Sequence, residues 1–62
     1  MQKSTILQAL KEYGSENVKT KLNEPKGEDF CASYINEQIE KGADFETSLG
    51  WLEQYLSDIY NN

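Results

Sequence analysis

The chain has no means of cross-linking itself, and this most constrains what it can fold into. Its 62 residues contain one cysteine, Cys31, and no histidine. An internal disulfide needs two cysteines, and structural zinc sites are built from sets of cysteine and histidine ligands. We therefore expect no metal and no cofactor. A single domain spanning residues 1–62 must then be held by hydrophobic packing, by a second copy or by a partner.

The clearest periodic signal lies in residues 45–60. Five apolar residues recur there at intervals of four, three, four and three: Phe45, Leu49, Leu52, Leu56 and Ile59. This spacing places them on one side of a helix, with Asp44 as its N-cap. Two heptads are too few for a long coiled coil, so we predict that the five residues form the buried seam of a small bundle.

Two other segments have a helical pattern. The first covers about residues 5–13, where Thr5 and Gln8 form a capping-box pattern and Gly14 follows as a stop signal. The second covers residues 28–41, where apolar side chains gather on one face and Gly42 marks the end.

Residues 15–26 fit two interpretations. Val18 and Leu22 are four residues apart, as on a helix, but residues 18–22 also alternate as in a strand. A single strand would have no partner in this chain. We therefore predict an all-α fold, a small three-helix bundle with an extra short helical turn between the first two helices.

Charge is unevenly distributed along the chain. Residues 1–27 carry five lysines against three glutamates, a net charge of +2, whereas residues 28–62 carry Lys41 against eight acidic residues, a net charge of −7. The overall charge of −5 disfavours direct binding to nucleic acid. The acidic half favours a protein partner that is basic or itself binds nucleic acid. The alternative is that these are ordinary solvated helix faces.

The sequence also bears on the cellular compartment of the protein and on the source of its gene. No stretch approaches the ~20 apolar residues of a membrane span, and the first residues lack the apolar segment of a signal peptide. A lone thiol is typical of a reducing compartment, so we expect a cytoplasmic protein with no membrane contact. All six basic residues are lysines, a bias typical of AT-rich coding DNA such as that of some phages.

Catalysis is not expected. The chain has no histidine, the most common general acid or base, and its serines have no such base to activate them. Cys31 falls on the apolar face of its helix beside Glu28 and Asp29, whose charges oppose ionisation, so we interpret it as a buried, inert residue.

Trp51 and Tyr55 are the best candidates for binding. They are four residues apart and lie outside the predicted seam, in the sector that also holds Ser48, Asp44 and Asp58. Tryptophan and tyrosine are enriched at interaction hot spots. The alternative is that Trp51 packs on the first helix or on residues 15–26.

Two further residues enter the candidate surface. Glu37 and Glu40, from the acidic half, complete the predicted partner-binding set. Gly50, in another sector of the same helix, is unfavourable inside a helix, which a close approach by a partner or a second copy, or a tolerated imperfection, would explain.

These observations predict a non-catalytic protein-binding regulator or inhibitor, of the kind encoded by phages or mobile elements. It would present an acidic and aromatic surface to a larger host protein, with mimicry of DNA as a sharper form. The alternatives are a self-associating structural or assembly module that forms a homodimer, and a small protein of the bacteriocin-immunity type.

Overall fold

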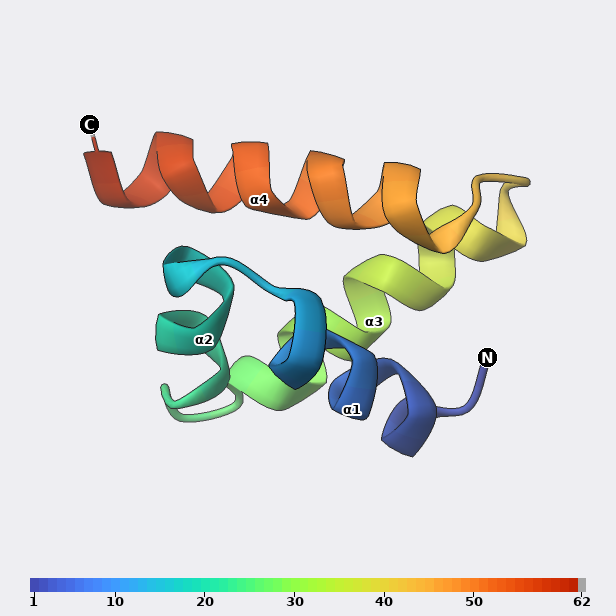
Figure 1. Cartoon of the computed structure of the whole chain (residues 1–62), viewed down its shortest axis with the longest axis horizontal. Helices are drawn as coiled ribbons and strands as arrows, with labels where there is room; N and C mark the ends of the chain where they lie inside the picture. Colours follow the sequence, from blue (N-terminus) through green and yellow to red (C-terminus); the bar gives the residue numbers. More distant parts are fainter. Residues whose placement is uncertain (62) are drawn as a thin grey trace.

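Four α-helices account for most of the chain in the computed structural model, which describes residues 1–61 (Figure 1). They are α1 (Lys3–Tyr13), α2 (Glu16–Leu22), α3 (Gly27–Glu40) and α4 (Phe45–Asn61). No strand occurs within residues 1–61, so the prediction of an all-α fold is confirmed. The helix count is four and not three.

The additional helix is α2, which replaces the predicted short turn. Val18 and Leu22 are both buried in the core. Their burial requires α3 and α4, which both pack against α2. A segment whose own pattern is ambiguous thus becomes a helix because its two apolar side chains meet the rest of the core.

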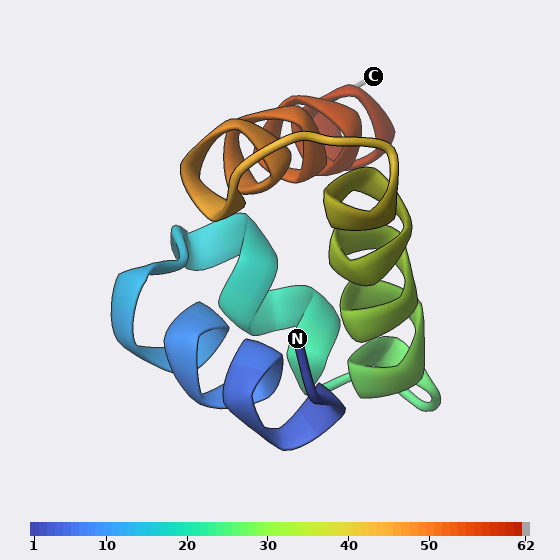
Figure 2. The ribbon, with the colours of Figure 1, turned by 90° about the vertical axis from the view of Figure 1, so that its right-hand side faces the viewer.

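The helices form an arrangement in which α1 and α4 lie on opposite sides, with α2 and α3 between them (Figure 2). α3 packs against each of the other helices, and α2 also packs against α4. Nine buried apolar residues form the core: Ile6, Leu10, Val18, Leu22, Cys31, Ala32, Ile35, Leu52 and Leu56. All four helices contribute side chains to this one core, so none of them buries its apolar face without the others.

The start of α1 differs from the prediction. The helix begins at Lys3 after Gln2, and no side chain caps it, so the capping box at Thr5 and Gln8 is wrong. Gly14 does end the helix, and its N–H donates to the carbonyl of Leu10 at 2.8 Å. A Cβ at Gly14 would lie 2.8 Å from Cγ1 of Val18, so glycine lets α1 pass close to α2.

The turn from α3 to α4 follows the predicted signals. The N–H of Ala43 donates to Gln38 O and that of Gly42 to Ile39 O, the two hydrogen bonds of a Schellman motif. Gly42 has a φ of 106°, a conformation that glycine adopts most readily. Asp44 Oδ1 then accepts the N–H of Thr47 at 2.8 Å, which confirms Asp44 as the N-cap of α4.

The turn from α2 to α3 is tight. Lys26 takes the left-handed conformation, with a φ of 62°, directly before Gly27. Gly27 is buried against the end of α2, and a Cβ at this position would lie 1.6 Å from the carbonyl oxygen of Lys21. The backbone of α3 therefore approaches that of α2 closely enough to exclude any side chain at residue 27.

Candidate protein-binding surface

One side of α4 presents an exposed apolar row. Trp51, Tyr55 and Ile59 have exposed fractions of 48%, 44% and 51%. They are spaced by four residues, so they are successive neighbours on the helix surface. We call these three residues the α4 stripe.

Ile59 belongs to the stripe and not to the buried seam, so its predicted burial is wrong. On a helical wheel it lies at the edge of the seam, about 40° from Tyr55. The C-terminal end of α4 also extends beyond the end of α2 (Figure 1). Leu52 and Leu56 are buried as predicted, Phe45 and Leu49 are half-buried, and Ser48 is buried although the sequence placed it beside Trp51.

The middle of the stripe rests on an aromatic stack formed with α3. The ring of Tyr55 stacks on Phe30 and Tyr34, with centroid distances of 5.8 and 6.0 Å. Phe30 and Tyr34 are half-buried, with centroids 6.3 Å apart. Tyr55 thus has one face held by α3, whereas its position in the stripe keeps it partly exposed to solvent.

A second set of contacts fixes this end of α4. The hydroxyl of Tyr60 donates to Glu24 Oε2 at 2.6 Å. Lys21 Nζ donates to Glu24 Oε1 at 3.2 Å and lies 4.9 Å from the centre of the Phe30 ring. The hydrogen bond from Tyr60 and the bond from Lys21 lower the pKa of the Glu24 carboxyl, and the same carboxylate raises the pKa of Tyr60 to about 12. α4 is therefore tied to the turn that joins α2 and α3.

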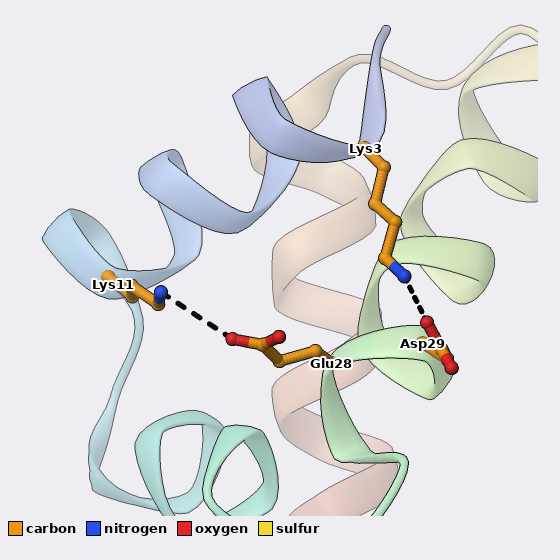
Figure 3. A network of polar contacts seen from close by, with 4 residues as sticks. All are labelled: Lys3, Lys11, Glu28 and Asp29. Carbon is orange, nitrogen blue, oxygen red and sulfur yellow. Dashed lines mark hydrogen bonds and ion pairs between the residues drawn. The ribbon is translucent and has the colours of Figure 1, made fainter.

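Ion pairs change where the negative charge of the acidic half lies. Lys3 pairs with Asp29, and Lys11 pairs with Glu28 at 3.5 Å, so α1 covers the acidic start of α3 (Figure 3). The Lys3 ammonium lowers the pKa of the Asp29 carboxyl. Within residues 1–61 no ion pair involves Asp44 or the three acids of α4, which are Glu46, Glu53 and Asp58. Of the five acids of residues 28–61 that have no ion pair, four therefore lie on α4 and its cap, and the fifth is Glu40 on α3.

The structure brings four of the six predicted partner-binding residues to one flank. Asp44, Trp51 and Asp58 are seven residues apart and form a line along α4. Tyr55 lies beside that line, and Asp58 accepts a hydrogen bond from the side-chain amide of Gln54 at 3.1 Å. Thr47 N–H lowers the pKa of the Asp44 carboxyl.

The two remaining residues lie on α3. Glu37 follows Phe30 and Tyr34 on the same flank and pairs with Lys41 at 3.2 Å. Glu40 points away from the buried side of α3 and accepts a hydrogen bond from Asn36 at 3.3 Å. Glu37 thus borders the aromatic stack, whereas Glu40 does not join the surface around Trp51.

Sequence reasoning missed the contributions of Phe30, Tyr34 and Ile59. The four-residue spacing of Trp51, Tyr55 and Ile59 was a signal for the third stripe residue. The heptad spacing of Ile59 with Leu52 and Leu56 assigned it to the seam instead. The pairing of Tyr55 with Phe30 and Tyr34 depends on which flanks of α3 and α4 meet, and no local pattern reports that.

Cys31 is buried in the core, as predicted. Burial raises the pKa of its thiol, and Lys21 and Glu24 are the nearest charged groups that act on it, with opposite effects. The sequence had assigned the opposing charge to Glu28 and Asp29. The residue is a small apolar part of the core, and its thiol is kept neutral.

The surface hollows lie away from the α4 stripe. Three open hollows of about 230, 330 and 260 Å³ border α1, α2 and the start of α3, and none is lined by Trp51, Tyr55 or Ile59. Among residues 1–61, no three cysteine or acidic side chains come together to hold a metal ion. No helix in this part of the chain is both long and apolar enough to cross a membrane.

Comparison of the chain with protein-family models, curated proteins and solved structures gave no match.

Proposed function

We propose that the protein is a non-catalytic regulator or inhibitor that acts by binding a larger, basic protein through the α4 stripe. The observation that carries this proposal is the row of three exposed apolar side chains on one flank of α4. Single exposed apolar residues are ordinary on a protein surface, but a contiguous group is typical of an interaction site.

The composition and support of the stripe agree with this role. It contains tryptophan and tyrosine, which dominate interaction hot spots, and a rim of carboxylates. Tyr55 is held by Phe30 and Tyr34, so little side-chain freedom remains to be lost when a partner binds. An exposed apolar row of this kind suits contact with an apolar surface of another protein.

The proposal is tested by affinity capture from the source cells with the intact chain and two variants. Trp51→Ala removes the largest stripe residue, and Tyr13→Ala removes an exposed aromatic side chain on α1 as the matched control. We expect Trp51→Ala to weaken retention of the partner more than tenfold, which corresponds to about 1.4 kcal/mol or more, as for a hot spot.

Circular dichroism must first show that both variants stay folded. We expect Tyr13→Ala to retain the partner as well as the unchanged chain does. Equal retention by all three proteins would contradict the proposal, because the partner would then bind elsewhere on the molecule.

A further inference from the structure

The flank of α4 that carries the stripe has one acidic group before the stripe, Asp44, and another beside its last residue, Asp58. Asp44 and Asp58 are fourteen residues apart, or about 21 Å along the helix axis, with Trp51 midway between them. Hydrogen bonds from Thr47 N–H and the Gln54 amide hold the two carboxylates in place. The apolar row and its two flanking charges therefore have a defined length and spacing.

The dimensions of the row suit one kind of structural element. Trp51 to Ile59 spans eight residues, or about 12 Å, which is roughly two helical turns. A partner helix that packs along α4 would present apolar side chains at intervals of three and four residues over the same length. A residue beyond the apolar section would then reach the level of Asp44, and a residue at the side of that section would reach Asp58, which directly precedes Ile59.

Charge argues against a second copy of this chain as the occupant. Residues 45–61 contain three acids and no basic residue. A symmetric dimer places the same surface on both sides of the interface, so two copies of α4 would bring like charges together. Lys3 and Lys11 are already paired with Asp29 and Glu28 on α3. A cationic partner would bring opposite charges to the acids of α4, so neither objection applies to it.

We propose that the α4 stripe binds a basic amphipathic helix, whose apolar side chains cover Trp51, Tyr55 and Ile59 and whose lysine or arginine side chains face Asp44 and Asp58. This inference rests on the proposed function and specifies the chemistry of the partner at the same surface.

The test uses the intact chain and a synthetic peptide of about 18 residues, enough for five helical turns. The peptide has leucines at alternating intervals of three and four, with lysines flanking them. A second peptide with glutamate in place of every lysine is the control. Because the protein has one tryptophan, a change in the fluorescence of Trp51 reports occupation of the stripe directly.

We expect the lysine peptide to bind and to shift Trp51 emission, and the glutamate peptide to bind at least tenfold more weakly at low salt. Asp44→Asn with Asp58→Asn should weaken the lysine peptide roughly three- to tenfold, as for two exposed ion pairs, and the difference should vanish at high salt. Asparagine keeps the cap of α4. Glu46→Gln with Glu53→Gln, on the opposite flank, is the matched control and should have a smaller effect.

Three results would overturn the inference. The first is equal binding of the two peptides. The second is binding of neither, and the third is a stable dimer in sedimentation that shields Trp51 from quenchers. If neither peptide binds but capture of the cellular partner still depends on Trp51, the proposed function stands and only the helical, basic nature of the partner is wrong.

Discussion

Alanine at two glycines should change stability in opposite directions. Gly27 is the first residue of α3, whereas Gly50 lies in the interior of α4, where alanine is favoured over glycine by about 1 kcal/mol. Helix propensity alone therefore predicts that Gly50→Ala stabilises the fold and gives no reason for Gly27→Ala to destabilise it. The atoms around the two residues predict that Gly27→Ala destabilises the fold and that only Gly50→Ala stabilises it.

The packing around Gly27 sets the size of the effect. An added Cβ would lie 1.6 Å from the carbonyl oxygen of Lys21, whereas such contacts are essentially never under 3.0 Å, so the two atoms must separate by at least 1.4 Å. The oxygen belongs to the backbone of Lys21 and the position of the Cβ is fixed by the backbone of residue 27, so no change of rotamer relieves the contact. Overpacking costs about 1–3 kcal/mol, and we expect the upper end of that range. A core of this size rarely supplies more than about 3–5 kcal/mol.

Nothing lies within 4 Å of a Cβ added at Gly50, so that substitution keeps the full gain in propensity. Thermal unfolding followed by circular dichroism measures both changes. At about 4–8 °C per kcal/mol, Gly27→Ala should lower the melting temperature by more than 10 °C and Gly50→Ala should raise it by about 4–8 °C. Two shifts of the same sign would refute the packing described for the turn between α2 and α3.

Three further measurements test other parts of the structure. Leu52→Ala should lower the free energy of unfolding in urea by about 2–4 kcal/mol, whereas Ile59→Ala should change it by about 0.5 kcal/mol or less, and equal losses would contradict the assignment of Ile59 to the stripe. Cys31 should react slowly with a thiol reagent in the folded protein and fast in denaturant, because burial shields the thiol and raises its pKa; equal rates would show it exposed. Tyr60→Phe should lower the melting temperature at neutral pH. The difference from the unchanged chain should shrink as pH rises from about 10, the pKa of tyrosine in the unfolded chain, toward about 12, the pKa of Tyr60 in the folded protein. It should also shrink in acid, as Glu24, whose pKa is lowered in the folded state, becomes protonated; a difference that does not vary with pH would contradict the role of this bond.

The parts of the fold that follow from local pattern were predicted well. The period of α4 identified Leu52 and Leu56, and the chemistry of the turn identified Gly42 and Asp44. In each case neighbouring residues carry the whole signal. A Schellman motif or an N-cap is complete within six residues, so the rest of the molecule hardly affects it.

The errors arise where distant segments decide the outcome. Val18 and Leu22 form part of a helix because α3 and α4 bury them, and their own spacing fits two structures. The spacing of Ile59 predicts which side of α4 its side chain occupies, but it does not tell whether another helix covers the C-terminal end of α4. The exposure of Trp51 and Tyr55 was predictable from their angular offset, whereas the support of Tyr55 by α3 was not.

The position of α4 in the chain has a consequence for biosynthesis. Ser48, Leu52 and Leu56 are buried, and α2 as well as α3 packs against the helix that carries them. Residues 1–44 lack these three buried side chains and the helix that covers α2 and α3, so we expect them to remain open while the ribosome is still adding α4. Folding would then begin only after the residues near Leu56 emerge. Until that point the nascent chain exposes Val18, Leu22 and Ile35 to chaperones and proteases.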